Sequence, residues 1–175
     1  MAATDGHHLH LAAARWRFFS IVEILGKSAI LADMEHIPHA KDGSVFVDDR
    51  GHFAPFLDNA EVPVKRVYYV VNHSPGTIRG FHFHEREWKY FTILQGMAKF
   101  VALNPQHPEQ KYTFVSSQRK PNVVVIPPGY ANGWVSLENN TILLCASTAT
   151  TKESIEDDKR FDPHQWGDVW SVKAR

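Results

Sequence analysis

The sequence predicts an all-β protein built as a sandwich or barrel, for two reasons. From residue 44 onward, short runs of aromatic and β-branched residues are punctuated by Gly, Pro, Asn and Asp, as expected of strands separated by turns. These runs recur at regular spacing, which is typical of small sandwiches and barrels. A chain of 175 residues with 43% hydrophobic residues is long enough for one domain with a real core.

Residues 1–40 are predicted to be an N-terminal extension, and residues 41–175 a single β domain. The extension carries helix formers and few turn signals, so a short helix plus a strand or a loosely docked arm are both open. Ten strands are predicted after it, at 44–47, 51–57, 64–72, 77–84, 89–95, 97–104, 111–115, 122–128, 133–137 and 141–148. Asn139-Asn140 is a tight hairpin signal between the last two of these strands.

The C-terminal part of the chain is predicted to hold no further domain. The charged run from Glu153 to Arg160 indicates a solvated face. The aromatic side chains of residues 161–170 are expected to pack back on the barrel.

Charge and cysteine content limit the partners and the compartment. Nineteen basic residues balance nineteen acidic ones, so we expect neither nucleic acid nor a membrane as partner. Cys145 is the only cysteine, which suits a reducing cytoplasm. The apolar run 18–34 is broken by charged residues and is too interrupted to span a bilayer or to serve as a signal peptide. We therefore expect a cytoplasmic protein.

His82 and His84 lie two residues apart in a predicted strand, so their side chains should project into one pocket. Their spacing resembles the first signature of the cupin fold, a small jelly-roll barrel, which Gly76 and Gly96 also fit. The glutamate of that signature is replaced by Lys89.

The second cupin signature is similar to the stretch after residue 126. Pro127, Pro128 and Gly129 fit it, while its histidine is replaced by Asn132. A cupin metal site uses three histidines and a carboxylate. Lysine repels a divalent ion and asparagine is a weak ligand, so we predict no metal. A metal cupin such as a dioxygenase remains the alternative.

Without a metal, the pocket suits proton abstraction next to a carbonyl group. His82 could take the proton, and the Lys89 ammonium could stabilise the enolate oxygen. The histidine then needs a carboxylate to hold its ring. Asp162 is one candidate, and Asp48 and Asp49 are others.

The chain also resembles the dTDP-4-dehydrorhamnose 3,5-epimerases, which are metal-free cupins. The resemblance runs from about residue 48 to residue 170 and rests on DDRGHF, NHSPGTIRGFHFH, WKYFTILQG, VIPPGYANGW and KRFDP. It implies an all-β, single-domain cupin jelly-roll barrel, a nucleoside-diphosphate sugar (dTDP-linked) as substrate, no cofactor and a homodimer that exchanges strands.

The resemblance assigns a role to each matching position. His82 corresponds to the catalytic base, Lys89 to the lysine that stabilises the enolate, and Asp162 to the aspartate that pairs with the base. Arg79 corresponds to an arginine that binds the diphosphate, and Arg50 to one that reaches the nucleotide of the partner subunit. Further substrate-binding candidates near the barrel mouth and its polar rim are Asn72, Ser74, Asn132 and Tyr130.

Several positions depart from the family pattern. Cys145 stands where the family has its tyrosine acid, so Tyr130 is considered as a substitute. His84 replaces a glutamine and is either a second acid/base or a packed neutral side chain, and Pro55 replaces a glutamate. Strict alternation would turn Arg79 away from His82, which a bulge at Gly80 would resolve.

Three functions follow from these features. The first is epimerisation of a nucleoside-diphosphate 4-keto-6-deoxy sugar. The second is the related 3,4-ketoisomerisation, which uses a histidine pair such as His82 and His84. The third is a sugar-nucleotide-binding module that has lost catalysis.

Overall fold

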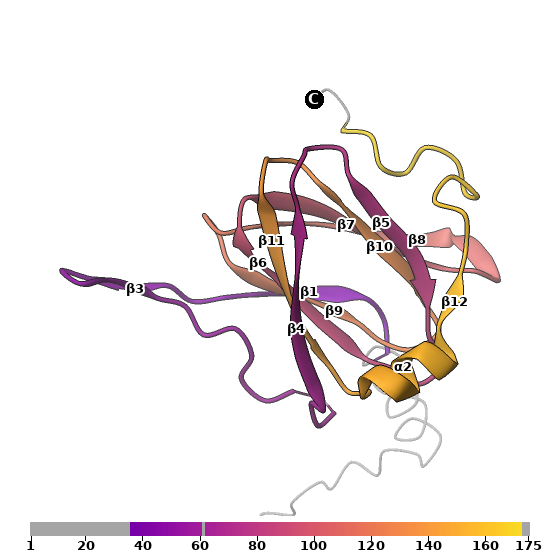
Figure 1. The fold of residues 1–175 in the computed structure, drawn as a ribbon, viewed down its shortest axis with the longest axis horizontal. Helices are drawn as coiled ribbons and strands as arrows, with labels where there is room; N and C mark the ends of the chain where they lie inside the picture. The colour runs from indigo at the N-terminus through magenta and orange to yellow at the C-terminus, as the bar shows by residue number, and fades with distance from the viewer. Residues whose placement is uncertain (1–35, 61, 173–175) are drawn as a thin grey trace, which may run out of the picture. The chain divides into compact units, whose positions relative to one another are not determined.

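The computed structural model describes residues 36–60 and 62–172, and the first 35 residues of the predicted N-terminal extension lie outside this range. Two five-stranded antiparallel sheets face each other (Figure 1). The first sheet has the order β1 (His39–Asp42), β9 (Asn122–Ile126), β6 (Lys89–Gln95), β11 (Thr141–Ser147), β4 (Arg66–Asn72). The second has the order β12 (Lys159–Arg160), β5 (Ile78–Phe83), β10 (Ala131–Ser136), β7 (Met97–Asn104), β8 (His107–Ser117). The all-β prediction is confirmed.

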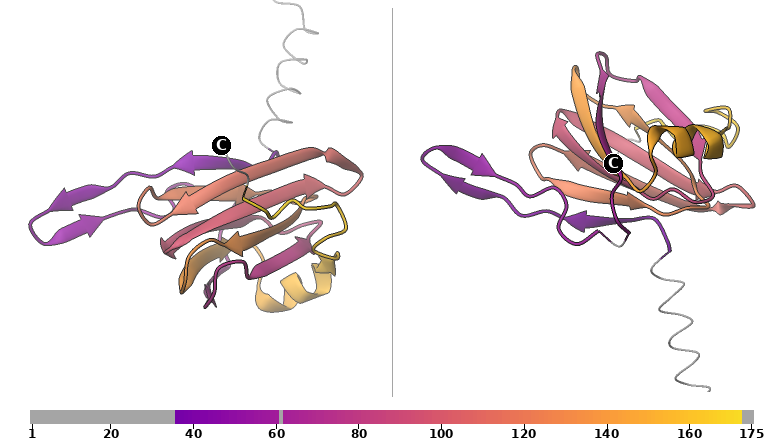
Figure 2. Two further views of the ribbon diagram at one scale, coloured as in Figure 1. Left: turned by 90° about the horizontal axis from the view of Figure 1, so that it is seen from above. Right: turned by 60° about the horizontal axis from the view of Figure 1, so that its bottom comes forward.

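A separate hairpin pairs β2 (Phe46–Asp48) with β3 (Gly51–Phe53). Figure 2 shows this hairpin extending away from the two large sheets. Its large apolar side chains are exposed, with Phe46 at 60%, Val47 at 77% and Phe53 at 65%. These side chains leave an exposed apolar patch on the hairpin.

Three elements of the structure were not predicted from the sequence: β1, β12 and the helix α2 (Thr151–Asp157). The helix begins with a capping box, in which Thr150 Oγ1 accepts from the Glu153 backbone N–H and the Glu153 side chain accepts from the Thr150 N–H. Thr-x-x-Glu is a recognisable start signal for a helix. The helix matters for function because it forms one wall of the site described below.

The turn predicted at Asn139-Asn140 is present, with Asn140 at a φ of 51°. The predicted hairpin is wrong, because β10 and β11 belong to different sheets. Gly96 likewise connects strands of different sheets, β6 of the first to β7 of the second. In a jelly roll, consecutive strands cross between the sheets, so a local turn signal does not imply that its flanking strands pair.

The core lies between the two sheets and holds an aromatic stack. Phe91 of the first sheet stacks on Phe100 of the second at 5.5 Å, and Phe100 stacks on Trp134 at 6.4 Å. A second apolar cluster lies under the C-terminal tail, where Phe81 contacts Trp166 and Trp170. The predicted packing of the tail on the barrel is therefore confirmed.

A bulge in β5 places Arg79 and His82 on the same cavity. Asn132 pairs with His82 and Trp134 pairs with Arg79, so β5 holds one more residue than β10 across this interval. The extra residue reverses the alternation of side chains, as the glycine at position 80 predicts. In the described part of the chain, no helix is long and apolar enough to cross a membrane.

We expect Gly133→Ala to destabilise the domain by about 1–3 kcal/mol, the usual cost of overpacking. A Cβ at position 133 would lie 2.7 Å from the Arg79 carbonyl oxygen and 2.8 Å from Gly80 Cα, and backbone cannot move aside cheaply. Urea unfolding of the variant and the parent checks this value. A change below about 0.5 kcal/mol, the size of an ordinary surface substitution, would contradict it.

Candidate functional site

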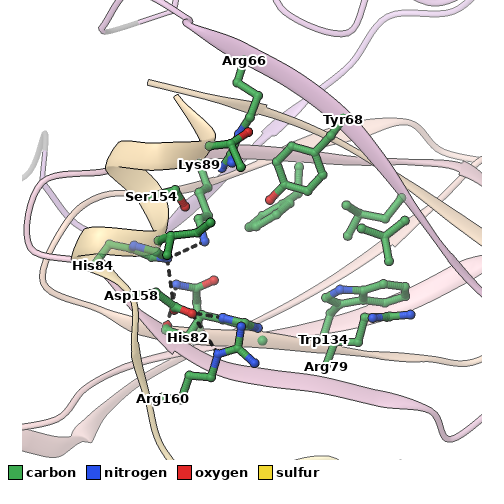
Figure 3. Close-up of a pocket in the computed structure, with 17 residues that line it drawn as sticks. Arg66, Tyr68, Arg79, His82, His84, Lys89, Trp134, Ser154, Asp158 and Arg160 are labelled. Atoms are coloured by element: carbon green, nitrogen blue, oxygen red, sulfur yellow. Dashed lines mark hydrogen bonds and ion pairs between the residues drawn. The ribbon is translucent and has the colours of Figure 1, made fainter. Parts of the chain in front are cut away.

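A cavity of about 350 Å³ opens between the two sheets and the helix α2. Each sheet contributes side chains to it: Tyr68 and Lys89 come from the first, and His82 and Trp134 from the second. Figure 3 shows His82, His84, Lys89 and Asp158 gathered at one end of this cavity, and Tyr68, Trp134 and Arg79 toward the other. The cavity therefore joins a charged end, suited to chemistry, to an end where aromatic rings lie beside an arginine.

His82 is held by Asp158, whose Oδ1 lies 3.0 Å from His82 Nδ1. The second carboxylate oxygen of Asp158 accepts from Arg160 Nε at 2.8 Å. This arrangement leaves Nε2 as the nitrogen of His82 that is available for proton transfer. The partner predicted from the sequence, Asp162, instead accepts from the His164 backbone N–H at 2.7 Å in an exposed turn. That pairing prediction is wrong, and Asp158 takes its place.

The prediction that residues 153–160 form a solvated face is wrong at Asp158 for the same reason. The helix α2 ends at Asp157, and Asp158 follows as its C-cap residue. There the chain turns into β12, which pairs Arg160 with His82. The alternatives Asp48 and Asp49 lie in the β2–β3 hairpin, where Asp48 forms an ion pair with Arg50.

Burial lowers the pKa of His82, and the hydrogen bond that His82 donates to Asp158 only partly offsets this effect. His82 is therefore neutral near pH 7, as a proton acceptor must be. The pKa of Asp158 is also lowered. Burial acts to raise it, but hydrogen bonds from Arg160 and His82 outweigh that effect. The Asp158 carboxylate is thus charged and stabilises an imidazolium when His82 takes up a proton.

Lys89 is a buried cation, with a relative exposure of only 6%. Its Nζ lies 2.8 Å from His84 Nε2. Burial lowers the pKa of Lys89, and that of His84 falls to about 4, also mainly through burial. His84 is consequently a neutral hydrogen-bond acceptor and Lys89 the donor. The packed neutral side chain is the alternative for His84 that this geometry favours.

Tyr68 supplies a hydroxyl group at the other side of the cavity from His82 (Figure 3). Burial and the neighbouring Cys145 thiol raise the pKa of Tyr68, so the phenol keeps its proton. Cys145 itself is fully buried and is not among the described residues that line the cavity. Because Cys145 pairs with Tyr68 across β11 and β4, a tyrosine adjoins the position where the family pattern expects one.

Three arginines surround the cavity: Arg66, Arg79 and Arg160. Arg79 Nε donates to Asn72 Oδ1 at 2.7 Å, which fixes the direction of the guanidinium. Arg66 lies over the Tyr68 ring at 4.9 Å. Guanidinium groups at a cavity mouth suit the recognition of phosphate groups.

The predicted substrate-binding residues divide into two groups. Asn132 lines the cavity, and its Nδ2 donates to the His82 carbonyl oxygen at 3.0 Å. Asn72 and Ser74 instead lie behind Arg79: Asn72 is buried, and the Ser74 carbonyl accepts from Ser136 Oγ at 2.7 Å. The other two predicted residues, Tyr130 and Arg50, also lie outside the cavity lining.

Tyr130 packs edge-on against Tyr112 at 5.8 Å, outside the cavity lining. Arg50 lies in the β2–β3 hairpin, with its side chain 85% exposed and directed at Asp48. Neither reaches the cavity within this chain, so a role for Arg50 requires a second copy.

Among the cavity residues that sequence reasoning did not assign to the site are Arg66, Tyr68, Trp134 and Asp158. Arg66 and Tyr68 alternate in one strand and therefore share a face, a signal that was available in VKRVYYVVN. The position of Asp158 had no comparable signal, because it depends on where α2 ends.

The donor groups of His82, His84 and Asp158 lie within 4.8 Å of one another. They do not fit a divalent ion as they stand. Lys89 donates to His84 Nε2 and Arg160 donates to Asp158 Oδ2, so a divalent ion would have to displace Lys89 from His84 and would lie beside two cationic side chains.

Comparisons with known proteins agree with this architecture. The rmlC epimerase of Mycobacterium tuberculosis superposes with a TM-score of 0.68 at 19% identity, covering 76% of this chain and 74% of that chain. A dTDP-4-dehydrorhamnose 3,5-epimerase from Bacillus anthracis, solved with TDP and PPi bound, gives 0.68 at 20% identity, covering 78% and 86%. The sugar 3,4-ketoisomerase QdtA of Thermoanaerobacterium thermosaccharolyticum, in complex with TDP, gives 0.60 at 19% identity, covering 71% and 88%.

These similarities confirm the fold expected from the resemblance to the epimerases. A search of curated proteins found no match. The model of the polysaccharide biosynthesis C-terminal domain family matches residues 46–157, a span that holds both sheets except β1 and β12. The chain therefore belongs to the polysaccharide biosynthesis C-terminal domain family.

Proposed function

We propose that the chain is a sugar-nucleotide isomerase that epimerises a nucleoside-diphosphate 4-keto-6-deoxy sugar. The observation that carries this proposal is the pairing of His82 with Asp158 in a cavity that also holds the Lys89 ammonium. A base and a cation in one cavity are what enolisation of a ketone requires. The family and the fold shared with sugar epimerases support the choice of substrate class.

In the proposed reaction, His82 Nε2 removes the proton from the carbon next to the C4 ketone. The electron pair moves onto the ketone oxygen, where Lys89 stabilises the enolate. Asp158 stabilises the imidazolium that results. Reprotonation of the carbon from the opposite face inverts the centre, and Tyr68 is the group that we assign to this step.

The nucleotide would lie toward the arginines. Arg79, fixed by Asn72, and Arg160 are suited to the diphosphate. We further propose a homodimer in which the β2–β3 hairpin of one copy brings Arg50 to the nucleotide of the other. Exposed Phe46, Val47 and Phe53 on that hairpin support an intermolecular contact. The one cysteine, buried Cys145, suits a reducing compartment such as the cytoplasm.

Incubation with a dTDP-linked 4-keto-6-deoxy sugar in D₂O tests the proposal. We expect deuterium at C3, at C5 or at both, detected by NMR, with inversion at the exchanged centre. The absence of deuterium at both carbons would overturn the proposed function. Binding measured by calorimetry without exchange would identify a module that binds the sugar nucleotide and does not turn it over.

The second candidate is 3,4-ketoisomerisation. The observation in its favour is that one carboxylate serves two imidazoles, since Asp158 Oδ1 lies 3.0 Å from His82 Nδ1 and 3.6 Å from His84 Nε2. The same D₂O experiment separates the two, because this reaction yields a 3-keto product and transfers deuterium to C4.

We expect a bell-shaped dependence of kcat/KM on pH. His82 must be neutral, so activity is lost as the pH falls through its pKa, which burial places below the ordinary 6.5. Lys89 must be charged, so activity is lost as the pH rises through its pKa, which burial places below 10.5. Rates measured from pH 4 to pH 11 check both limbs. An acidic limb above 6.5 would contradict the assignment of His82 as the base.

A further inference from the structure

Glu87 is a buried carboxylate that the proposed reaction does not use. It lies between β5 and β6, and its side chain has no exposed surface. One oxygen, Oε1, accepts from Ser147 Oγ at 2.5 Å and from Arg66 Nη2 at 3.1 Å. Burying a carboxylate is costly unless it is paired, and these two donors fix its orientation.

The other oxygen of Glu87 faces His84. Glu87 Oε2 and His84 Nδ1 are 3.1 Å apart. Both atoms are buried and make no hydrogen bond among the described residues, so their approach is an ion-pair contact. The remaining acidic group near Nδ1, Asp157, is farther away at 3.9 Å. The carboxylate of Glu87 is therefore the group that decides whether His84 Nδ1 carries a proton.

The two nitrogens of His84 face opposite partners. Nδ1 faces an acceptor, Glu87, at 3.1 Å. The Lys89 ammonium, which can only donate, lies 2.8 Å from Nε2, nearer than Asp158 Oδ1 at 3.6 Å. The two shorter contacts are compatible with each other only when Nδ1 carries the hydrogen and Nε2 has a lone pair. The opposite tautomer would set two acceptors against each other on one side of the ring and two donors on the other.

We propose that Glu87 is a positioning residue, whose carboxylate holds His84 as the Nδ1–H tautomer so that Nε2 aims the Lys89 ammonium into the cavity. This role rests on the proposed function, in which Lys89 stabilises the enolate. Glu87 acts through His84 and does not touch substrate. The low pKa of His84, about 4, agrees with a neutral ring that has one donor and one acceptor.

The variant Glu87→Gln tests the proposal with little change of shape. Its amide oxygen would stay with the two donors, Arg66 and Ser147, and its NH₂ group would then face His84 Nδ1. Nδ1 would have to accept, so the hydrogen would move to Nε2, opposite Lys89. We expect kcat to fall by about 10–100-fold, the usual effect of losing a group that orients a functional histidine, with little change in KM.

The tautomer is read directly by NMR of protein labelled with ¹⁵N-histidine, with the signals of His84 assigned from a His84→Gln sample. Wild-type protein at pH 7 should show the Nδ1–H form, and Glu87→Gln should show the Nε2–H form. Glu85→Gln is the matched control, because Glu85 is exposed and binds Lys159 at the surface. It should leave both the tautomer and kcat unchanged.

An Nε2–H tautomer or an imidazolium in wild-type protein would overturn the proposal, and this measurement needs no variant of Glu87. An unchanged tautomer in Glu87→Gln, or a kcat within twofold of wild type, would overturn it as well. If the tautomers are as expected but the protein gives no exchange in D₂O, the proposed reaction is refuted. The positioning of Lys89 by Glu87 would then still stand. If Glu87→Gln does not fold, Ser147→Ala loosens the same carboxylate and should lower kcat in the same direction.

Discussion

Replacing His82 with asparagine is expected to lower kcat/KM by about 10²–10⁴-fold, the contribution of a positioned general base. Asparagine is close to histidine in size and can still hydrogen-bond Asp158, but it cannot accept a proton. Steady-state rates and deuterium exchange should fall together, because both depend on the same proton abstraction. The denaturant midpoint should change little, which separates a loss of chemistry from a loss of fold.

The exposed histidine His107 provides a matched control. It forms an ion pair with Glu109 at the surface, and His107→Asn should keep the wild-type rate. Asp158→Asn and Asp162→Asn extend the test to the carboxylate that pairs with His82. The first should reduce the rate and the second should not, because only Asp158 contacts His82. A loss of less than tenfold in His82→Asn would refute its assignment as the base.

The sequence was sufficient to predict the two groups that carry the proposed reaction. His82 and Lys89 lie at the spacing of a known signature on adjacent strands in the chain, so a short segment fixes both positions. The bulge that turns Arg79 toward the cavity was also predictable, because glycine at position 80 leaves room for close backbone contact. The positions of His82 and Lys89 and the bulge at Gly80 depend on residues close together in the sequence, which is why the sequence predicts them.

Asp158 could not be predicted in the same way. In sequence it belongs to a run of charges on a short helix, where exposure is the ordinary outcome. It faces His82 because the helix ends at Asp157, Asp158 follows as the C-cap, and Lys159 and Arg160 then pair with β5. Asp162 was the nearer match to the family pattern, but it lies beyond that edge strand.

Tyr68, and not residue 145, supplies the phenol at the cavity because of the order of the strands in the sheet. Side-chain alternation predicts which face a residue occupies, but it does not predict which strands are neighbours. Tyr68 and Cys145 are far apart in the chain and are brought side by side by the pairing of β4 with β11. Tyr68 on β4 can thus provide a phenol to the cavity from the strand next to β11. A cysteine in place of tyrosine at position 145 therefore does not by itself remove the general acid.

Replacing Lys89 with methionine is expected to lower kcat by about 10²–10³-fold, the usual cost of removing one group that stabilises a developing oxyanion. Methionine keeps most of the length of the lysine stem and removes only the charge. KM should change much less, because the ammonium interacts most strongly with the enolate. The pH profile should lose its alkaline limb, since that limb is assigned to Lys89.

The stability of Lys89→Met distinguishes a catalytic role from a structural one. Lys89 is buried at a cost in solvation free energy, so a well-packed methionine should leave the free energy of unfolding unchanged or raise it. Lys111→Met, on the exposed face of β8, is the matched control and should keep the wild-type rate. If Lys89→Met unfolds readily while its residual activity per folded molecule matches wild type, the ammonium stabilises the fold and not the enolate.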